Sequence, residues 1–393
     1  MYNFDELIPR EGTHSYKLEF RKKFFGREDI LPLWVADMDI ASPREVADII
    51  QQRAAHEIYG YTVRGQWFQQ AVIEWLKKRH NWNIQEGWIE YAPGVVPSLV
   101  IAIMAFTDPG DKVLIQTPVY PPFFSVVKDN SRELVTNPLI EKEGYYSIDF
   151  DLLDKQTSDP NLKLFIFSQP HNPVSRVWTK EELLKVAEIC LKNNVLIVSD
   201  EIHSDLMLFG NKHIPLASLG DEIAQNTITC MAASKTFNIA GFSTSYIITP
   251  NRKLMLGFRR VLMALHLFTG NIFGAIATEA AYKYGESWLN ELLLYLEGNV
   301  KLVQNFISSN MPEIKISDPQ ATFLLWLDFR NWQLSQPELK DLIINEARVG
   351  LNDGASFGEE GKGFMRLNVG SPKSMIEEGL VRILKARDRV NVK

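Results

Sequence analysis

The chain has 393 residues, of which 46% are hydrophobic and 23% charged, and its net charge is −6. This length exceeds one small core and predicts a large globular domain with a smaller one beside it. The negative charge excludes a global positive field, so we expect neither nucleic acid nor a membrane surface as a partner. Only Cys190 and Cys230 are present, in no CxxC pair, which argues against a disulfide framework or a zinc site and fits a reducing cytoplasm.

The first twenty residues show no basic region followed by an apolar core, so we expect no signal peptide. The longest apolar stretch, residues 94–106, is too short to span a bilayer and contains Pro97 and Ser98. The sequence therefore predicts a cytoplasmic protein.

From about residue 90, short β-branched runs alternate with longer amphipathic ones. The predicted strands are residues 113–116, 164–168, 195–199, 227–231 and 245–248. Between the second and third of these, Thr179 and Glu182 form the capping box of a helix. The alternation predicts an α/β fold with a largely parallel sheet covered by helices on both faces.

The pattern changes after residue 248. Residues 273–308 are predicted to be a long helix, with interruptions near Gly285 and Gly298. "TFLLWLDF" and "GFMRLNVG" are predicted strands separated by a helix near 337–347, and a last helix follows. We expect a large domain at 40–280, and a smaller α+β domain formed by 281–393 together with the N-terminal segment 1–39.

Polar residues follow the predicted strands at positions that suit a shared site. Tyr120, Asn172, Asp200 and Lys235 each come soon after the end of a different strand. Ligands of open α/β sheets bind beyond the carboxyl ends of the strands, so we expect these four side chains to converge. Two polar neighbours, His171 and Glu201, are assigned structural roles.

One ligand uses all four groups. A lysine amine condenses with a carbonyl to form a Schiff base, and pyridoxal phosphate (PLP) supplies an aldehyde. Its pyridine nitrogen needs a carboxylate to stay protonated, which suits Asp200. Asn172 can bond the phenolic oxygen, and Tyr120 can stack on the ring. Gly94 precedes an apolar helix, whose first amides, those of Val95 and Val96, can bind the phosphate.

Seven segments, in order from about Pro32 to the last helix, resemble one family: "WVADMD", "YGYT", "TPVYPPF", "PHNPVSRVW", "SDEIH", "SKTFNIAG" and "FMRLN". They are similar to the PLP-dependent enzymes of fold type I, which have the aspartate-aminotransferase-like fold. Within that group they resemble the cystathionine β-lyase and cystalysin group of C–S lyases, relatives of the class I and II aminotransferases.

The resemblance assigns roles residue by residue. It implies that Lys235 is the Schiff-base lysine and Asp200 the pyridinium partner. Asn172 contacts the phenolic oxygen, His203 lies close to it, and Tyr120 stacks on the ring. These residues form the expected catalytic and cofactor-binding set.

The remaining roles concern the substrate, the phosphate and the partner subunit. Arg366 is expected to bind the substrate α-carboxylate in a bidentate fork, with Asn172 beside it. Tyr61 is expected to reach the phosphate and substrate of a neighbouring subunit, which implies a homodimer with shared sites. Phosphate binding then depends on Tyr61, Ser234 and the amides after Gly94.

Some positions depart from the family pattern. Many aminotransferases have a serine three residues before the lysine and an arginine eight residues after it, where this chain has Ala232 and Ser243. Aminotransferases commonly have tyrosine three residues after the aspartate, and His203 at that position favours the lyase branch. Cystalysin-like enzymes often have a second tyrosine where this chain has Pro121.

The predicted reaction is α,β-elimination on a sulfur amino acid such as cystathionine or cysteine, giving a thiol, pyruvate and ammonia. An aminotransferase is the first alternative, because it shares the early steps. A regulatory protein that keeps the fold and acts through a protein partner is the second. No GxGxxG follows a strand and no cluster of metal ligands occurs, which disfavours a nicotinamide dehydrogenase or a metal hydrolase.

Overall fold

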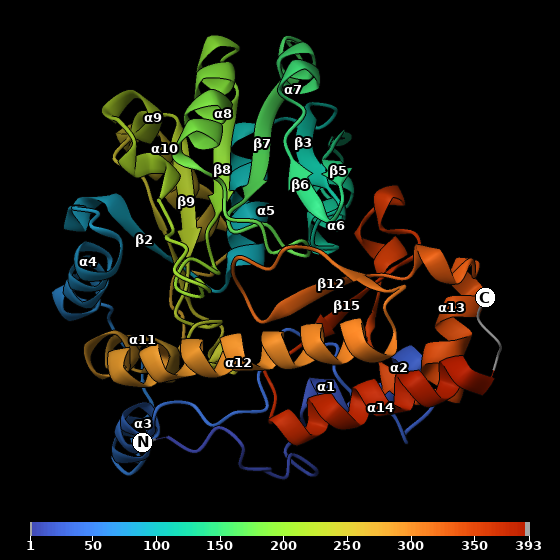
Figure 1. Cartoon of the computed structure of the whole chain (residues 1–393). Helices are drawn as coiled ribbons and strands as arrows, with labels where there is room; N and C mark the ends of the chain where they lie inside the picture. Colours follow the sequence, from blue (N-terminus) through green and yellow to red (C-terminus); the bar gives the residue numbers. More distant parts are fainter. Residues whose placement is uncertain (1, 390–393) are drawn as a thin grey trace.

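The computed structural model describes residues 2–389 and is built around a seven-stranded sheet (Figure 1). In spatial order its strands are β2 (Ile89–Ala92), β10 (Ser245–Ile248), β9 (Thr227–Met231), β8 (Leu196–Asp200), β7 (Leu162–Ser168), β3 (Lys112–Thr117) and β4 (Glu133–Pro138). Only β10 among these strands runs antiparallel to its neighbours. The predicted strands 227–231 and 245–248 coincide with β9 and β10 at both ends.

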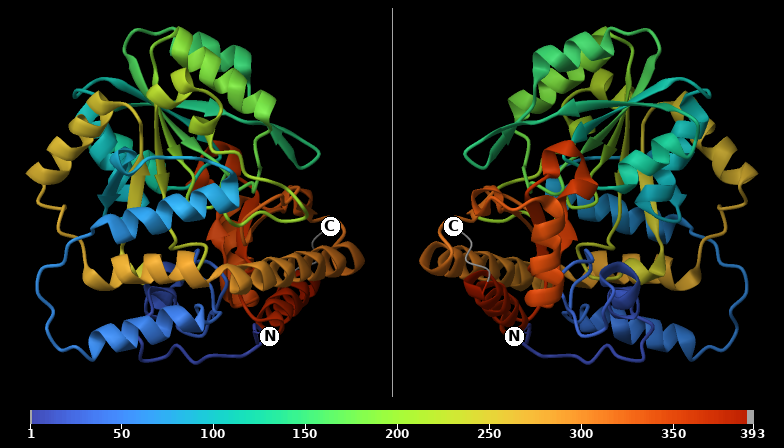
Figure 2. Two further views of the ribbon diagram at one scale, coloured as in Figure 1. Left: turned by 90° about the vertical axis from the view of Figure 1, so that its left-hand side faces the viewer. Right: turned by 90° about the vertical axis from the view of Figure 1, so that its right-hand side faces the viewer.

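Helices cover both faces of this sheet, as predicted (Figure 2). One face packs against α5 (Val95–Phe106), α6 (Pro122–Lys128) and α10 (Arg252–Ala264). The other packs against α7 (Phe150–Thr157), α8 (Lys180–Lys192) and α9 (Asp221–Gln225). Every residue of β8 and β9 is buried, because apolar layers lie on both sides of these strands. The fold is the expected aspartate-aminotransferase-like α/β architecture.

The predicted capping box of α8 is confirmed. Thr179 accepts a hydrogen bond from the Glu182 amide at 3.2 Å, and the Glu182 carboxylate accepts one from the Thr179 amide at 2.7 Å. The pair satisfies amides that would otherwise be free at the start of the helix. It also fixes where the chain turns back after the polar loop that follows β7.

The long helical region breaks at one of the two predicted glycines. Helix α11 (Ile272–Tyr284) ends before Gly285, and α12 (Glu286–Asn310) continues through Gly298. A Cβ at Gly285 would lie 2.5 Å from the Phe237 ring, so close packing requires glycine there. A Cβ at Gly298 meets nothing within 4 Å. The predicted break at Gly298 was wrong, because the buried apolar side of α12 outweighs the roughly 1 kcal/mol cost of one helical glycine.

A second, four-stranded sheet follows along the chain. Its strands, in spatial order, are β11 (Lys315–Ile316), β12 (Leu324–Asp328), β15 (Phe364–Asn368) and β14 (Asn352–Asp353). Helix α13 (Gln336–Asp341) continues into a π-helical turn at Leu342–Glu346, and α14 (Lys373–Arg389) lies beside α12 (Figure 1). The strand β1 (Leu31–Pro32) pairs in parallel with β13 (Val349–Gly350), so the N-terminal part packs against this region.

The remaining elements flank these two sheets. They are α1 (Tyr16–Glu19), α2 (Arg21–Phe25), α3 (Arg44–Ala54), α4 (Gln66–His80) and the hairpin of β5 (Ile140–Lys142) and β6 (Tyr145–Ser147). The boundaries 40–280 and 281–393 stay predictions. Within residues 2–389, no helix has the length and apolar character needed to cross a membrane.

Candidate active site

The carboxyl ends of the central strands open onto a cavity of about 220 Å³. The predicted residues that line it are Gly94, Val95, Val96, Tyr120, Asn172, Asp200, His203, Ser234 and Lys235. The parallel register explains this convergence, because Ser168 lies opposite Asp200 and Asp200 opposite Cys230. Loops that leave neighbouring strands at the same level must meet at the same edge.

Lys235 lies in the loop after β9, and its Nζ donates a hydrogen bond to the backbone oxygen of Ala36 at 2.6 Å. Burial of the amine lowers the pKa of Lys235 to about 8, although the charges of Asp37 and Asp200 act in the opposite direction. The positive charge of Arg366 lowers this pKa further. An amine with such a pKa is partly neutral near pH 7–8, as a nucleophile or base must be.

Asp200 is the last residue of β8 and is 8% exposed. One carboxylate oxygen accepts a hydrogen bond from the Ile202 amide at 3.1 Å. No ion pair to Asp200 forms within residues 2–389, and burial raises the pKa of this carboxyl to about 7. A buried carboxylate without a cationic partner favours a ligand that carries a positive charge.

The adjacent Glu201 has the opposite environment. Its carboxylate bonds the His213 ring at 2.7 Å, and it accepts hydrogen bonds from the Ser199 hydroxyl at 2.8 Å and the Leu216 amide at 3.2 Å. Its side chain is fully buried. With these bonds Glu201 is a structural residue, and of the two carboxylates Asp200 is the one that lines the cavity.

Arg366 lies in β15 of the second sheet, adjacent to the cavity. Its guanidinium donates to the Asn172 side chain at 3.0 Å, the Asn352 side chain at 2.7 Å and the Trp34 backbone oxygen at 3.2 Å. All three acceptors are neutral, and burial lowers the pKa of Arg366 to about 10. A buried guanidinium with only neutral partners suits an anionic ligand such as a carboxylate.

The N-terminus of α5 forms another wall of the cavity. Gly94 takes a φ of 157°, and Val95 begins a helix of 12 residues. No side chain among residues 2–389 caps this helix, so the first amides face the cavity without a side-chain acceptor. Ser234 and Ser243 line the same cavity. This arrangement suits a phosphate, because helix N-termini favour anions.

His203 and Tyr120 complete the enclosure. Burial, with the nearby charges of Lys235 and Arg366, lowers the pKa of His203 to about 3, so the imidazole is neutral. Its Nδ1 is buried and has no hydrogen-bond partner within the described chain. Burial also raises the pKa of Tyr120, whose ring therefore stays un-ionised at neutral pH.

Tyr61 lies apart from this cavity. It is fully exposed, in the stretch between α3 and α4, and borders a different surface hollow together with Arg64 and Phe268. Ile58, Tyr59 and Val63 of the same stretch are also exposed. Its expected role toward a partner subunit stays a prediction.

Sequence reasoning missed three contributors to the site. Ala36 lines the cavity, Trp34 binds Arg366, and Asn352 binds the same guanidinium. Ala36 and Trp34 act through backbone oxygens, which leave no trace in residue type. Asn352 lies next to Arg366 only because β14 pairs with β15.

PLP has a complement for three of the groups described above: a ring nitrogen for Asp200, an aldehyde for Lys235 and a phosphate for the N-terminus of α5. The fold places its ligand at the same edge of the sheet, so fold and site together define a PLP-dependent enzyme of fold type I. The chain belongs to the family of class I and II aminotransferases, whose family model matches residues 29–383.

Three relatives indicate a narrower group within this family. The chain is 45% identical over 384 residues to the cystathionine β-lyase PatB of Bacillus subtilis (strain 168), covering 98% of this chain and 99% of the relative. Cystalysin from Treponema denticola, whose crystal structure contains PLP, is 37% identical with a TM-score of 0.97, covering 99% and 100% of the two chains. The PLP-bound C–S lyase of Staphylococcus hominis is 35% identical with a TM-score of 0.91, covering 98% of each. The resemblance to the C–S lyase group is confirmed.

Proposed function

We propose that the protein is a PLP-dependent C–S lyase that cleaves the Cβ–S bond of sulfur amino acids such as cystathionine or cysteine. Water is consumed, and a thiol, pyruvate and ammonia are released. The observation that carries the proposal is a buried Lys235 amine in one cavity with Asp200 and next to Arg366, neither of which has an ionic partner within residues 2–389, in a chain whose relatives are named C–S lyases.

When bound, PLP supplies a carbonyl for the amine and an electron-accepting ring. Arg366 binds the α-carboxylate and fixes the direction of the Cα–H bond relative to the ring. Lys235 in its neutral form removes the Cα proton, because its pKa of about 8 leaves a free lone pair near neutral pH. Asp200 in its ionised form keeps a proton on the ring nitrogen.

The other cavity residues orient and enclose the ligand. The amides of Val95 and Val96, with Ser234, would hold the phosphate, and Asn172, which accepts a hydrogen bond from Arg366, would bond the phenolic oxygen. Tyr120 would stack on the ring, and the neutral His203 would lie close to the phenolic oxygen. Together these side chains exclude water from the reacting carbon.

We place the enzyme in the cytoplasm as a homodimer in which Tyr61 of one subunit reaches the site of the other. Its full exposure beside Ile58, Tyr59 and Val63 supports this, because monomers rarely expose such groups together. Tyr61→Phe should raise the KM for the amino acid several-fold, with Tyr145→Phe, another exposed tyrosine, as the control. An unchanged KM in a dimeric variant would contradict the shared site.

The deciding experiment incubates the purified protein with L-cystathionine in the absence of any keto acid. Release of pyruvate and thiol in equal amounts is the expected result. Amino-group transfer that needs a keto acid, without thiol release, would establish the aminotransferase instead. Visible cofactor absorbance with neither activity would favour the regulatory protein.

A further inference from the structure

Residues 33–42, here called the crossing segment, pass between the part of the active site that carries Lys235 and the part that carries Arg366. They connect β1 with α3 and run between the loop after β9 and the strand β15. The backbone oxygen of Trp34 accepts a hydrogen bond from Arg366 at 3.2 Å, and that of Ala36 accepts one from Lys235 at 2.6 Å. Two carbonyl groups only two residues apart therefore bind both functional cations.

Asn368, two residues after Arg366, holds the same segment. Its side-chain amide donates to the backbone oxygens of Val35 at 2.5 Å and Asp37 at 2.7 Å. Its backbone amide donates to Leu33 at 3.0 Å. The carbonyls that Asn368 binds alternate with those that bind Arg366 and Lys235.

Asn238, three residues after Lys235, holds the next part of the segment. Its side-chain amide donates to Met38 at 2.9 Å and Ile40 at 2.7 Å, and its side-chain oxygen accepts from the Met38 amide at 3.0 Å. Every carbonyl from Leu33 to Met38 thus accepts a hydrogen bond from outside the segment. Such complete satisfaction leaves one backbone position available to the segment.

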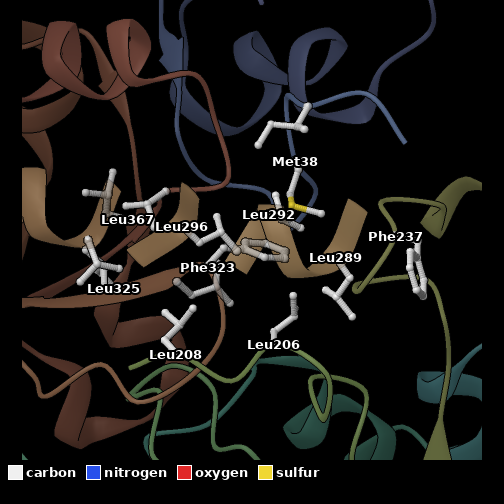
Figure 3. Packing of buried hydrophobic residues seen from close by; sticks show 14 of the residues in the cluster. Met38, Leu206, Leu208, Phe237, Leu289, Leu292, Leu296, Phe323, Leu325 and Leu367 are labelled. Atoms are coloured by element: carbon white, nitrogen blue, oxygen red, sulfur yellow. The ribbon is translucent and has the colours of Figure 1, made fainter. Parts of the chain in front are cut away.

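Side chains of the crossing segment also fix its position. Met38 points into the apolar cluster near Leu292 (Figure 3). Asp39 pairs with Lys17 at 2.6 Å and with Arg10 at 2.5 Å, and the Lys17 side chain is fully buried. A shift of the backbone would break these ion pairs and the core contact together.

We propose that Asn238 and Asn368 are positioning residues that, through the crossing segment, set the position of the Lys235 amine relative to the Arg366 guanidinium. The inference rests on the proposed function only in needing a cofactor at Lys235. The proposal requires that a substitution next to Arg366 also change the position of Lys235, and the reverse, because both side chains bind the same short stretch of backbone.

One consequence follows for the lysine. The nitrogen that Ala36 holds in the free protein lies among charges of both signs, so a change in its position changes its pKa. These charges are those of Asp37, Arg366 and Asp200. A neutral substitution at Asn368 does not remove any of these charges, so a change in the pKa of the nitrogen reports a change in its position.

The test uses the holoenzyme with Asn368→Ala and Asn238→Gly. Glycine is chosen because Asn238 has a φ of 55°, where alanine is strained. In each variant we expect the pH midpoint of the cofactor's visible absorbance to shift by about 0.5 unit or more, because the Lys235 nitrogen moves relative to the charges of Asp37, Asp200 and Arg366. We also expect kcat to fall about tenfold and KM for the amino acid to rise.

The effect of each variant on the more distant cation distinguishes a positioning role from a general loss of stability. Asn368→Ala, beside the arginine, must shift the lysine's spectral midpoint, and Asn238→Gly, beside the lysine, must raise KM. The double variant should resemble the worse single variant, because both act on one segment. Asn368→Ser, which returns one donor, should give an intermediate midpoint and provides a second variant if the alanine variant does not accumulate.

Asn137→Ala is the matched control. Asn137 is fully buried in β4, away from the crossing segment, and its side chain accepts a hydrogen bond from Gln116 at 3.0 Å and donates one to Gln156 at 3.0 Å. It should lower the unfolding temperature as much as Asn368→Ala while leaving the midpoint and KM unchanged. If Asn368→Ala loses stability but keeps the wild-type midpoint, the inference is overturned. If the midpoint shifts but the wild type releases no thiol, the proposed function fails and the inference stands.

Discussion

Two acidic groups at the end of β8 lie in opposite surroundings. Asp200 faces the cavity with one backbone hydrogen bond, whereas Glu201 lies behind it, bonded to His213, Ser199 and Leu216. Burial alone does not separate them, since both are largely hidden from solvent. The difference lies in the number of hydrogen-bond partners. The buried charge of Asp200, which has no ionic partner, destabilises the fold until a cationic ligand binds.

The same contrast extends to the surrounding network. Asp205 accepts hydrogen bonds from Trp75, Thr236 and the His80 ring, and the His80 and His213 rings lie 5.3 Å apart. This satisfied set supports the loop that carries Lys235. On the cavity side, the Nδ1 of His203 and the Nε of Arg366 have no partner within residues 2–389. The Nδ1 of His213 also lacks a partner there, so the two sides differ in charge pairing: Glu201 and Asp205 each contact a histidine, whereas Asp200 and Arg366 have no ionic partner within residues 2–389.

The largest expected effect comes from Lys235→Ala. It removes both the amine that holds the cofactor and the base, so thiol release should fall at least about 10³-fold. The visible absorbance should vanish while the circular dichroism stays that of the wild type. Lys253→Ala, at an exposed position of α10, is the control and should be fully active. Residual turnover near the wild-type rate would assign the chemistry to another group.

Asp200→Asn should separate activity from stability. Loss of the charge that keeps the ring nitrogen protonated should lower kcat about 10²-fold or more. The pKa of Asp200 in the folded state, about 7, lies above the ordinary value of 3.8. The cost of ionising this carboxyl in the fold is therefore absent below pH 3.8, grows as the pH rises, and is complete above pH 7.

At pH 8 the cofactor-free Asp200→Asn protein should therefore be more stable than the wild type, by up to about 4 kcal/mol. Denaturant unfolding at pH 8 and at pH 4 measures this difference, which should shrink at the lower pH. Equal stability of the two proteins at pH 8 would show that Asp200 already has a partner.

Glu201→Gln should do the reverse. It replaces one of the two acceptor oxygens by an NH2 group, so the donors of His213, Ser199 and Leu216 can no longer all be satisfied, which should lower the free energy of unfolding by about 2–4 kcal/mol. The kcat of the folded enzyme should change far less than in Asp200→Asn. Glu188→Gln, exposed on α8, should leave stability unchanged. A larger loss of kcat than of stability would place Glu201 on the functional side.

The smallest effect concerns acid stability. Burial lowers the pKa of His213 in the folded protein despite the charge of Glu201, so the unfolded chain takes up a proton first as the pH falls below 6.5. His213 should therefore contribute a loss of stability of at most about 1.4 kcal/mol between pH 7.5 and 5.5. In His213→Gln that part of the loss should be absent from thermal unfolding curves. An unchanged pH dependence would show that folding does not lower the pKa of His213.

Much of the site could be predicted from the sequence. Residue type and the rule that ligands lie beyond the carboxyl ends of parallel strands were enough to bring Asp200, Asn172 and Lys235 together. The capping box at Thr179 was equally visible, because its two partners are three residues apart. The predictions that depended on local pattern alone were weaker, as the unbroken helix at Gly298 shows.

The sequence by itself determined which chemical groups are present and which predicted strand each one follows, since periodicity and the order of elements along the chain are read directly from it. Only the tertiary structure decided which of those groups stay unsatisfied. It supplied the hydrogen bonds that make Glu201 structural and leave Asp200 open to the cavity, and it placed the carbonyls of Trp34 and Ala36 against Arg366 and Lys235. The physical reason is that backbone carbonyls are the same in every residue, so their partners are fixed by packing alone.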